Sequence, residues 1–464
     1  MIAVTEYKGE TVAVLGLGRS GLATAKALDA GGAQVIAWDD DPARCDDGVA
    51  EGFVIADPET SLWRGAKAMM PSPGIMPTHS ALEAARACNM DIVGDIALFC
   101  RAVRTTPFVR LVAITGTNGK STTTALVNHI LQKAGVLVEM GGNIGVPALQ
   151  LSPPKPEKVY VLEVSSFQLE TAGDLAVNIA VLLNISPDHL ERHHTLDSYA
   201  GLKARIFAGQ SEGDVSIIGV DDLHGRKLMN ELKDRTPVKL VPLSISHDCE
   251  GGLYVRNGVL FDAMKASAQA VADLKTTRVL SGPHNWQNAA AAYGIARSLG
   301  VEKTSIVGAF SDFSGLPHRM EMVAERDGVR FVNDSKATNA AATAQALATY
   351  DRIFWIAGGV TKQYDAGVEA LPLENLVRAY LIGEAAADFA HQLGDKVDHG
   401  CYDSLADAIR VAAHDAWMEA RSGRGVVVVL LSPACASYDQ FSNFEVRGEV
   451  FRAVVQDVME RMPS

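Results

Sequence analysis

The chain has 464 residues, of which 48% are hydrophobic, and its formal net charge is −13. A chain of this length predicts two to four domains with ample core. The negative charge disfavours a nucleic-acid partner, because such a surface needs clustered Lys and Arg to displace counterions.

The chain also lacks the sequence signs of membrane insertion and of secretion. Its longest apolar run, Val426–Leu431, is far shorter than the ~20 residues that cross a bilayer. Glu6 and Lys8 lie where a signal peptide needs an apolar run. The six cysteines show no regular spacing, which is typical of reduced, mostly buried thiols. We therefore expect a cytoplasmic protein without membrane insertion, with a monomer as its state.

The first segment alternates strand and helix. A strand at Thr11–Leu15, a glycine turn at Gly16–Gly21, a helix at Leu22–Ala30 and a strand at Gln34–Trp38 form a βαβ unit, which implies a parallel sheet. The turn matches G-x-G-x-x-G, and Asp39 follows eighteen residues after it, as in dinucleotide-binding folds. Any diphosphate-linked nucleoside could use the same N–H groups, and a tight turn without a ligand is the alternative.

The pattern restarts with a strand at Leu111–Thr115, a loop at Gly116–Thr122 and a helix at Ser121–Ala134. The loop ends in Gly-Lys-Ser like a P-loop, but Ile114 stands where the longer motif needs its first glycine. Lys120 would neutralise phosphate oxygens, and the hydroxyls after it would hold Mg2+. The loop therefore indicates ATP binding rather than a GTPase or motor, with an ordinary glycine turn as the alternative.

Two acidic or histidine-rich places follow this loop. Glu163 ends the apolar strand Val159–Val164, where a Mg2+ ligand beside a phosphate loop belongs, although a surface glutamate is the alternative. The run Asp188–His194 could ligate a metal or form a solvated loop. We expect His193 and His194 at the surface.

The rest of the chain continues as α/β. Asn-Gly within Val255–Leu260 predicts a hairpin with a type I′ turn. Beyond Gly315-Leu316-Pro317, four strands alternate with helices at Arg330–Val332, Ile353–Ala357, Ala379–Ile382 and Val426–Leu431. Polar or Gly residues follow these strands, at the edge where open α/β sheets bind ligands. We predict an N-terminal Rossmann-like domain (1–94), a central ATPase-like domain with a parallel sheet (95–315) and a C-terminal Rossmann-like domain (316–464).

Several motifs together resemble the Mur ligase family of peptidoglycan synthesis, over essentially the whole chain. They are the short Thr-Gly-Thr-Asn-Gly-Lys-Ser loop, the strand ending at Glu163 and the segment Asn333–Asn339. Ser432–Phe441, with Asn443-Phe444-Glu445 and Arg447-Gly448, resembles members that add D-glutamate. The Asp-Asn-Pro-Arg motif of the diaminopimelate-adding relatives is absent from the sequence.

The resemblance implies an enzyme that uses ATP and Mg2+ to join D-glutamate to UDP-N-acetylmuramoyl-L-alanine through an acyl phosphate. Catalytic roles fall to Lys120, His189 and Lys203. ATP would contact Gly116, Thr117, Asn118, Gly119, Lys120, Ser121, Thr122, Asn288, Arg319 and Asp334. The metal would be held by Ser121, Glu163, His189 and, if it is carbamylated, Lys203. An uncarbamylated surface lysine is the alternative for Lys203.

The resemblance also divides the two other substrates between the ends of the chain. The UDP-substrate would contact Gly18, Arg19, Ser20, Ser72, Gly74, Asn143, Ser165 and Gln168. The acidic run Asp39–Asp41 departs from relatives that carry Thr-Arg beside the uridine. D-glutamate would contact Lys336, Thr338, Lys362, Ser437 and the backbone of Phe444.

Three other functions compete with this interpretation. A ligase of the same family could add a different amino acid. The first glycine turn alone would suit an NAD-dependent dehydrogenase. A nucleotide-dependent switch could hydrolyse ATP without joining anything.

Overall fold

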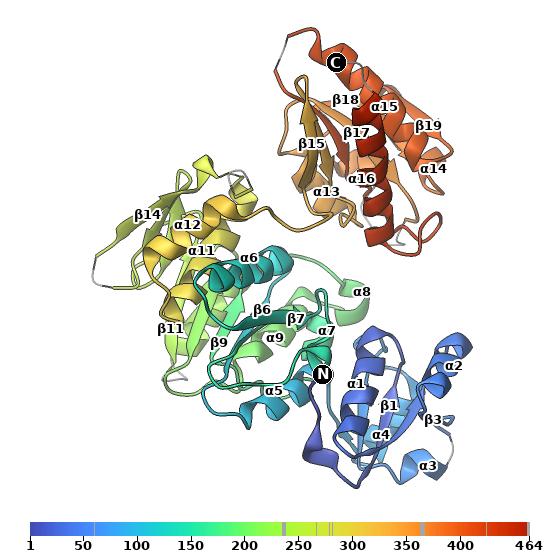
Figure 1. The fold of residues 1–464 in the computed structure, drawn as a ribbon, viewed down its shortest axis with the longest axis vertical. Helices are drawn as coiled ribbons and strands as arrows, with labels where there is room; N and C mark the ends of the chain where they lie inside the picture. The colour runs from blue at the N-terminus through green and yellow to red at the C-terminus, as the bar shows by residue number, and fades with distance from the viewer. Residues whose placement is uncertain are drawn as a thin grey trace. The chain divides into compact units, whose positions relative to one another are not determined.

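The computed structural model describes residues 1–59, 61–233, 238–265, 267–277, 279–280, 282–361, 367–423 and 425–461. They form two compact units, Met1–Ser314 and Gly315–Ser464, whose helices and strands are drawn in Figure 1. The described residues of the first unit build a five-stranded and a nine-stranded sheet, and those of the second build a six-stranded sheet. The predicted α/β class is confirmed. The predicted division near residue 95, inside the first unit, stays a prediction.

The five-stranded sheet is parallel and has the strand order of a Rossmann-like half. Its strands lie in the order β3 (Val54–Ile55), β2 (Gln34–Trp38), β1 (Thr11–Leu15), β4 (Ala68–Pro71) and β5 (Asp91–Ile92). Its helices are α1 (Arg19–Ala30), α2 (Pro42–Ala50), α3 (Ser61–Arg64), α4 (Ser80–Ala87) and α5 (Asp95–Arg104). Successive β1 side chains enter opposite cores, Val12 and Val14 on one face and Ala13 and Leu15 on the other. Both faces are covered, as a parallel sheet requires.

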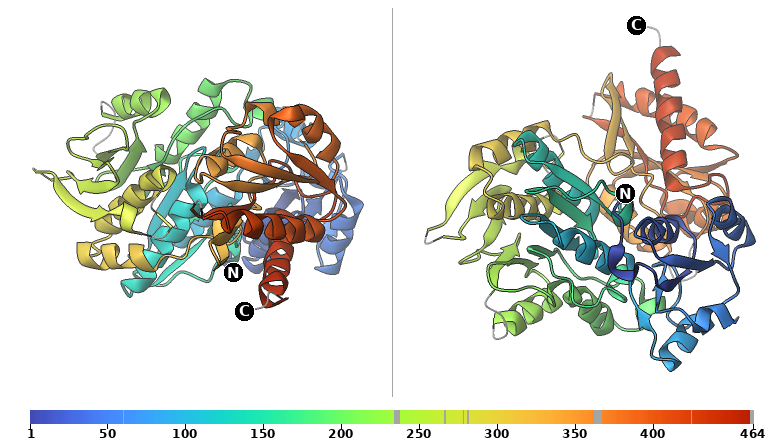
Figure 2. Two further views of the ribbon diagram at one scale, coloured as in Figure 1. Left: turned by 90° about the horizontal axis from the view of Figure 1, so that it is seen from above. Right: turned by 60° about the horizontal axis from the view of Figure 1, so that its bottom comes forward.

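The first unit holds together because one hydrophobic core runs through both of its sheets. Val12 of the first sheet and Leu162 of the second belong to the same buried cluster. The backbone N–H of Ile2 donates to Leu149 O over 2.8 Å. Both views in Figure 2, like Figure 1, show the N-terminus beside the teal central part of the chain.

The nine-stranded sheet is parallel over most of its width. Its order is β14 (Gln269–Asp273), β13 (Val259–Asp262), β12 (Leu253–Arg256), β11 (Lys239–Ser244), β10 (Val215–Gly219), β9 (Ile179–Leu182), β6 (Arg110–Thr115), β8 (Val159–Glu163) and β7 (Val138–Gly142). The helices are α6 (Lys120–Lys133), α7 (Ser166–Leu169), α8 (Leu190–His193), α9 (Leu196–Ala204), α10 (Leu223–Lys233), α11 (Pro283–Ser298) and α12 (Lys303–Asp312).

The predicted hairpin is confirmed and lies at one end of this sheet. Strands β12 and β13 pair antiparallel around Asn257 and Gly258, whose φ angles of 51° and 79° suit a type I′ turn. Strand β14 pairs antiparallel with β13. This end of the central sheet therefore departs from the predicted parallel arrangement, because a two-residue turn can join only antiparallel neighbours.

The second unit has a parallel sheet with one antiparallel edge strand. The order is β15 (Glu321–Arg326), β16 (Val329–Asn333), β20 (Val427–Leu431), β17 (Ile353–Gly358), β18 (Leu376–Ile382) and β19 (His399–Tyr402), and β15 is antiparallel. The helices are α13 (Ala340–Leu347), α14 (Ala386–Leu393), α15 (Leu405–Ala420) and α16 (Phe444–Arg461). Successive β17 residues, Phe354 and Trp355, enter separate cores on the two faces. Figure 1 draws α15 and α16 together, in red.

Two further expectations concern the surface. Within the ranges given above, no helix combines the length and the apolar character needed to cross a bilayer. All six cysteines are free, and three of them are buried. The expectation of mostly buried thiols is wrong for Cys88 and Cys401. Cys88 ends α4 and Cys401 lies on the edge strand β19, so both are exposed.

Candidate functional site

The glycine loop between β6 and α6 needs glycine at two positions. Gly116 and Gly119 have φ angles of 152° and 83°, which side chains disfavour. A Cβ on Gly119 would lie 2.1 Å from Oδ1 of Asn288, which comes from α11. The structure therefore brings Asn288 against the loop, while its predicted contact with ATP stays a prediction.

Lys120 begins α6 and folds back over the loop. Its Nζ donates to Gly116 O and Thr117 O, each over 2.8 Å. Asn184, just after β9, shapes the loop by accepting from the N–H groups of Thr117 and Asn118, both over 2.9 Å. The first-turn N–H groups of a 14-residue helix and a lysine thus converge on one place. This arrangement is suited to phosphate.

Lys203, on α9, is buried beside the same loop. Its Nζ donates to Gly116 O over 2.8 Å and to Thr115 Oγ1 over 3.4 Å, and its side chain is 1% exposed. The alternative of a surface lysine is wrong. The ammonium also lies 4.5 Å from the ring centroid of Tyr199, one turn earlier on α9. Sequence reasoning assigned Tyr199 no role, although its position four residues before Lys203 was a usable signal.

The charge of Lys203 is strongly disfavoured. Burial and the nearby Lys120 hold the pKa of Lys203 well below its ordinary value of 10.5, while Asp188 and Glu163 act in the opposite direction. These four groups therefore lie within electrostatic reach of one another. A buried amine with a lowered pKa is more often neutral, and a neutral amine can react with an electrophile.

Glu163 has the character of a cation ligand. It is 2% exposed, so the alternative of a surface glutamate is wrong. Its Oε1 accepts from Asn143 Nδ2 over 2.7 Å, and its Oε2 is buried without a hydrogen-bond partner among the described residues. Buried carboxylate oxygens are rarely left unsatisfied, which makes Oε2 suited to a cation. In the described part of the chain, no three His, Cys, Asp or Glu side chains are grouped as a ready-made metal site.

The histidine run after β9 divides between surface and interior. His189 is part-exposed, in a left-handed conformation, with its ring nitrogens 3.5 Å from carboxylate oxygens of Asp188 and Glu191. His194 is exposed, as expected. His193 is buried instead, with Nε2 3.0 Å from Ser166 Oγ, so the expectation for it is wrong. Ser166 lies 27 residues away on α7, so local sequence patterns could not predict this contact.

The β1–α1 turn has the close packing of a diphosphate-binding turn. A Cβ on Gly21 would lie 1.8 Å from Gly16 O, so no other residue fits there. Ser72 Oγ donates to Gly16 O over 3.0 Å, which brings Ser72 to the turn where Gly18 caps α1 and Ser20 follows.

Arg19 and Asp39 both make internal contacts near this turn. Arg19 donates through Nη2 to Gly145 O in the loop after β7. Asp39 is buried and accepts from Leu17 N over 2.6 Å, so this carboxylate closes the turn. Gly74 has open space around its Cα.

The remaining three residues predicted for the UDP-substrate lie between β7 and α7. Asn143 bonds to Glu163 as described. Ser165 and Gln168 form a capping box on α7. Gln168 is buried and its Nε2 donates to Asp95 over 3.1 Å, so its amide is used inside the protein. Burial raises the pKa of Asp95, which Gln168 opposes.

A cavity of about 230 Å³ lies beside this region, within the first unit. Ser72, Pro73, Phe167 and Arg205 are among its lining residues. Arg192 also lines it and donates to Ile75 O over 2.8 Å while pairing with Glu170. The sequence assigned no role to Arg192 or Glu170. Through the bond to Ile75 and the pair with Glu170, Arg192 holds the loop after β4 against the segment that follows α7.

In the second unit, Arg319 and Asp334 lie close enough to influence each other. Asp334 follows β16, is buried, and accepts from Ser432 Oγ over 2.8 Å and from Met320 N over 3.2 Å. Burial raises the pKa of Asp334 to about 7, and Ser432 and Arg319 act against that rise.

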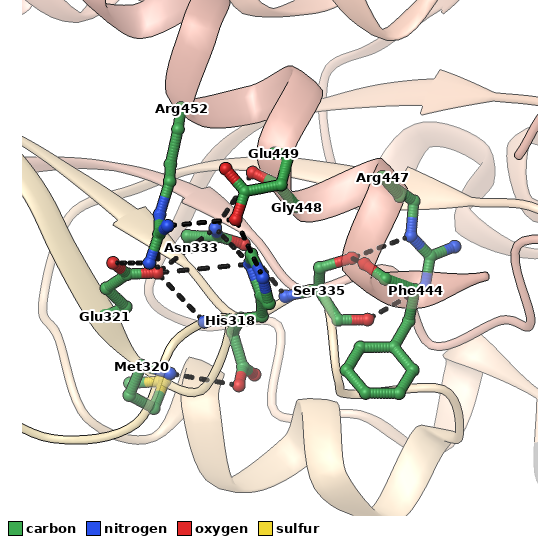
Figure 3. Close-up of polar contacts among 11 residues, drawn as sticks. His318, Met320, Glu321, Asn333, Ser335, Phe444, Arg447, Gly448, Glu449 and Arg452 are labelled. Atoms are coloured by element: carbon green, nitrogen blue, oxygen red, sulfur yellow. Dashed lines mark hydrogen bonds and ion pairs between the residues drawn. The ribbon is translucent and has the colours of Figure 1, made fainter. Parts of the chain in front are cut away.

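Two of the residues predicted for D-glutamate, Lys336 and Phe444, lie together at the start of α16. Lys336 Nζ lies 5.6 Å from the ring centroid of Phe444, and Ser335 Oγ donates to Phe444 O over 2.8 Å. Figure 3 shows Ser335 and Phe444 side by side with Arg447. Ser437 is buried and follows β20, and Thr338 N donates to Lys336 O over 2.8 Å. The predicted contact Lys362 lies outside the described residues.

Comparisons with known proteins place the chain in a family. The family model of the Mur ligase middle domain matches residues 114–296, and that of the Mur ligase, glutamate ligase domain matches 318–435. The UDP-N-acetylmuramoylalanine–D-glutamate ligase of Phenylobacterium zucineum (strain HLK1) is 48% identical over 99% of both chains. That of Rhizobium johnstonii is 46% identical over 97% of this chain and 96% of its own.

Solved structures share the fold at low identity. The UDP-N-acetylmuramate-alanine ligase of Thermotoga maritima has a TM-score of 0.58 at 17% identity, covering 97% of this chain and 99% of its own. A pseudomurein peptide ligase type C from Methanothermus fervidus has a TM-score of 0.55 at 17% identity, covering 97% and 100%. Given two relatives above 45% identity over almost their whole length, the chain belongs to the Mur ligase family.

Proposed function

We propose that this protein joins D-glutamate to UDP-N-acetylmuramoyl-L-alanine at the expense of ATP, in the cytoplasmic synthesis of peptidoglycan precursors. The observation that carries the proposal is the near full-length identity to relatives named for that reaction. The phosphate loop and the orphaned oxygen of Glu163 support the ATP-dependent part.

The residues around the loop fit ATP and Mg2+. Lys120 and the first turn of α6 would hold the phosphates, with Asn288 against the loop. The unpartnered Oε2 of Glu163 and the hydroxyl of Ser121 would hold Mg2+, with His189 as a further ligand. Mg2+ bound there would neutralise phosphate charge. Carbamylation of Lys203 would add an anionic oxygen ligand, and its lowered pKa favours the neutral amine that carbamylation requires.

The chemistry is the formation of an amide through an acyl phosphate. An oxygen of the alanyl carboxylate attacks the γ-phosphorus, and ADP leaves with the bonding electron pair. The neutral amine of D-glutamate then attacks the carbonyl carbon, and the tetrahedral intermediate expels phosphate while the nitrogen loses a proton. The protein needs no nucleophile of its own, so its task is positioning and charge compensation.

Electrostatic repulsion explains the cationic residues in this proposal. Two unit charges 4 Å apart interact by about 1 kcal/mol in water and by about 4 kcal/mol at a dielectric constant of 20. A carboxylate approaching ATP meets repulsion of this kind. Lys120 is the side chain at the phosphate loop that would offset it.

The other substrates are assigned by motif. The turn with Gly18, Arg19 and Ser20, together with Ser72 and Gly74, would take the UDP part. Asn143, Ser165 and Gln168 would face the muramoyl-alanine, although Gln168 would have to do so while bonded to Asp95. The D-glutamate set is Lys336, Thr338, Lys362, Ser437 and the backbone of Phe444. A monomer is the proposed state.

Release of phosphate from ATP tests the proposal directly. The purified protein should release phosphate only when UDP-N-acetylmuramoyl-L-alanine and D-glutamate are both present. Release that depends on a different amino acid would favour another ligase of the family. Release that is indifferent to D-glutamate would indicate a nucleotide switch, and formation of NADH would indicate a dehydrogenase.

A further inference from the structure

Arg447, on the second turn of α16, is a fully buried cation whose partners are neutral. Its Nε donates to Ser335 Oγ over 3.0 Å and its Nη2 donates to Ser335 O over 2.9 Å. Further bonds reach Cys435 O over 3.1 Å and Ala436 O over 3.4 Å. No carboxylate of a described residue lies within ion-pair distance of it. Figure 3 shows its guanidinium directed at Ser335.

The two segments that Arg447 joins are far apart in the sequence. One follows β16 and continues from Ser335 to Lys336 and Thr338. The other follows β20 and continues from Cys435 to Ser437. Both therefore run directly into residues assigned to D-glutamate, and Ser335 also bonds to the backbone of Phe444. One side chain thus fixes three parts of the candidate amino-acid site relative to one another.

Burial of a cation without an acidic partner is unfavourable for folding alone. Burial lowers the pKa of Arg447 to about 10, against smaller opposite effects of Cys435 and Asp439, so the guanidinium remains charged at neutral pH. An anionic ligand nearby would compensate this charge. The N-terminus of α16 adds partial positive charge at the same place.

Arg452 is a contrasting cation on the same helix. It is 28% exposed and pairs with Glu321 and Glu449. Figure 3 shows it among these carboxylates, away from Ser335. Its charge is already compensated within the protein, and it contacts neither segment that Arg447 joins.

We infer that Arg447 is a positioning residue for D-glutamate, whose guanidinium holds the Ser335–Thr338 and Cys435–Ser437 segments in the arrangement that an amino dicarboxylate requires. The inference rests on the proposed function. The forked donor set is essential to it, because Nε, Nη1 and Nη2 together reach Ser335 Oγ and three backbone carbonyls, whereas a lysine offers one nitrogen and would leave some of these acceptors without a donor.

Steady-state kinetics of the full chain with R447K, S335A and R452Q test the inference. The Michaelis constant for D-glutamate should rise about tenfold or more in R447K and about three- to tenfold in S335A, as expected for lost charged hydrogen bonds. The constants for ATP and for the UDP-substrate should stay within about twofold of wild type. R452Q, the matched control, should leave the constant for D-glutamate within about twofold.

The outcomes separate positioning from a purely structural role. Folded R447K with an unchanged constant for D-glutamate, or with equal rises for all three substrates, overturns the inference. If R447K does not fold, S335A decides, because it removes one hydroxyl and leaves the charge in place. A wild-type protein that releases phosphate without D-glutamate refutes the proposed function itself, before any variant is compared.

Discussion

Lys120 is the residue on which the nucleotide part of the proposed site most depends. Its ammonium is held by two loop carbonyls at the start of α6, where incoming phosphate would exchange for those contacts. The residues proposed for the UDP part of the other substrate lie elsewhere, around the β1–α1 turn. Loss of Lys120 should therefore affect phosphoryl transfer far more than binding of the UDP-substrate.

We predict that K120A lowers kcat at least ~100-fold, as for removal of an electrostatic stabiliser, while the Kd for the UDP-substrate changes little. Phosphate release and isothermal titration would measure the two quantities. K133A is the control on the same helix, since Lys133 is exposed and pairs with the exposed Asp312. Loss of UDP-substrate binding in K120A would contradict this separation of roles.

Glu163 supports a second prediction, about the metal. E163Q keeps the shape of the side chain but removes the charge behind the unpartnered Oε2. We expect about tenfold or more Mg2+ to be needed for half-maximal phosphate release, because a neutral amide is a weaker ligand for Mg2+. E139Q, on the neighbouring strand β7, is the control, since Glu139 pairs with Lys158. An unchanged Mg2+ titration in E163Q would exclude Glu163 as a ligand.

Sequence reasoning succeeded for residues whose place follows from strand, loop and helix order. Lys120 and Glu163 follow adjacent parallel strands, so the shared carboxyl edge brings them together. Sequence reasoning could not predict the bond from Gln168 to Asp95, or the burial of His193 against Ser166. Those contacts depend on packing between segments that local patterns do not relate.

At the scale of elements, Gly448 of helix α16 packs against His318, in the segment that begins the second unit. A Cβ on Gly448 would lie 2.1 Å from Nδ1 of His318. That ring is held by Asn333, whose Nδ2 lies 3.0 Å from it, so it has little freedom to move. Glycine is thus required inside this helix for a steric reason.

We predict that G448A destabilises the protein by about 1–3 kcal/mol, because the clash outweighs the better helix propensity of alanine. G308A is the control in the interior of α12, where a Cβ meets nothing within 4 Å. It should be neutral or stabilising by about 0.5–1 kcal/mol. Chemical denaturation followed by circular dichroism measures both, and equal effects of the two variants would refute the steric argument.

The elements themselves were largely readable from periodicity. Strands β1 and β2 have the predicted bounds, and α6 differs from its prediction by one residue at each end. The short edge strands β3, β5 and β19 carried no such signal, since they are two to four residues long. The antiparallel β15 was also not predicted, because its residues are only part-buried.

At the scale of the whole molecule, buried or part-buried histidines in both units link stability to acid pH. Burial lowers the pKa of His129, His193 and His318 below the ordinary value of 6.5. The unfolded chain therefore binds more protons than the folded chain once the pH falls below about 6.5. The stability that these groups contribute is complete above that pH and is lost as the pH falls through their folded values.

We predict that, as the pH falls from 7.5 to 5.5, the Tm of H193Q rises relative to that of the wild type. In H193Q, the unfolded chain has one fewer imidazole that takes up a proton, so acid favours unfolding less. Asp334 has the opposite effect. Because its pKa is raised to about 7, the stability that it contributes is lost as the pH rises through about 7. This contribution is the same in the wild type and in H193Q. Parallel Tm curves for the two proteins would exclude His193 as a contributor.

The shared core of the first unit has a consequence for how the protein is made. Ile2 leaves the ribosome long before Leu149, whose carbonyl it bonds to. The N-terminal segment must wait for nearly 150 further residues before it can take its final place, although its own sheet is complete much earlier. During synthesis, one face of that sheet therefore stays exposed, and a chaperone would find its substrate there.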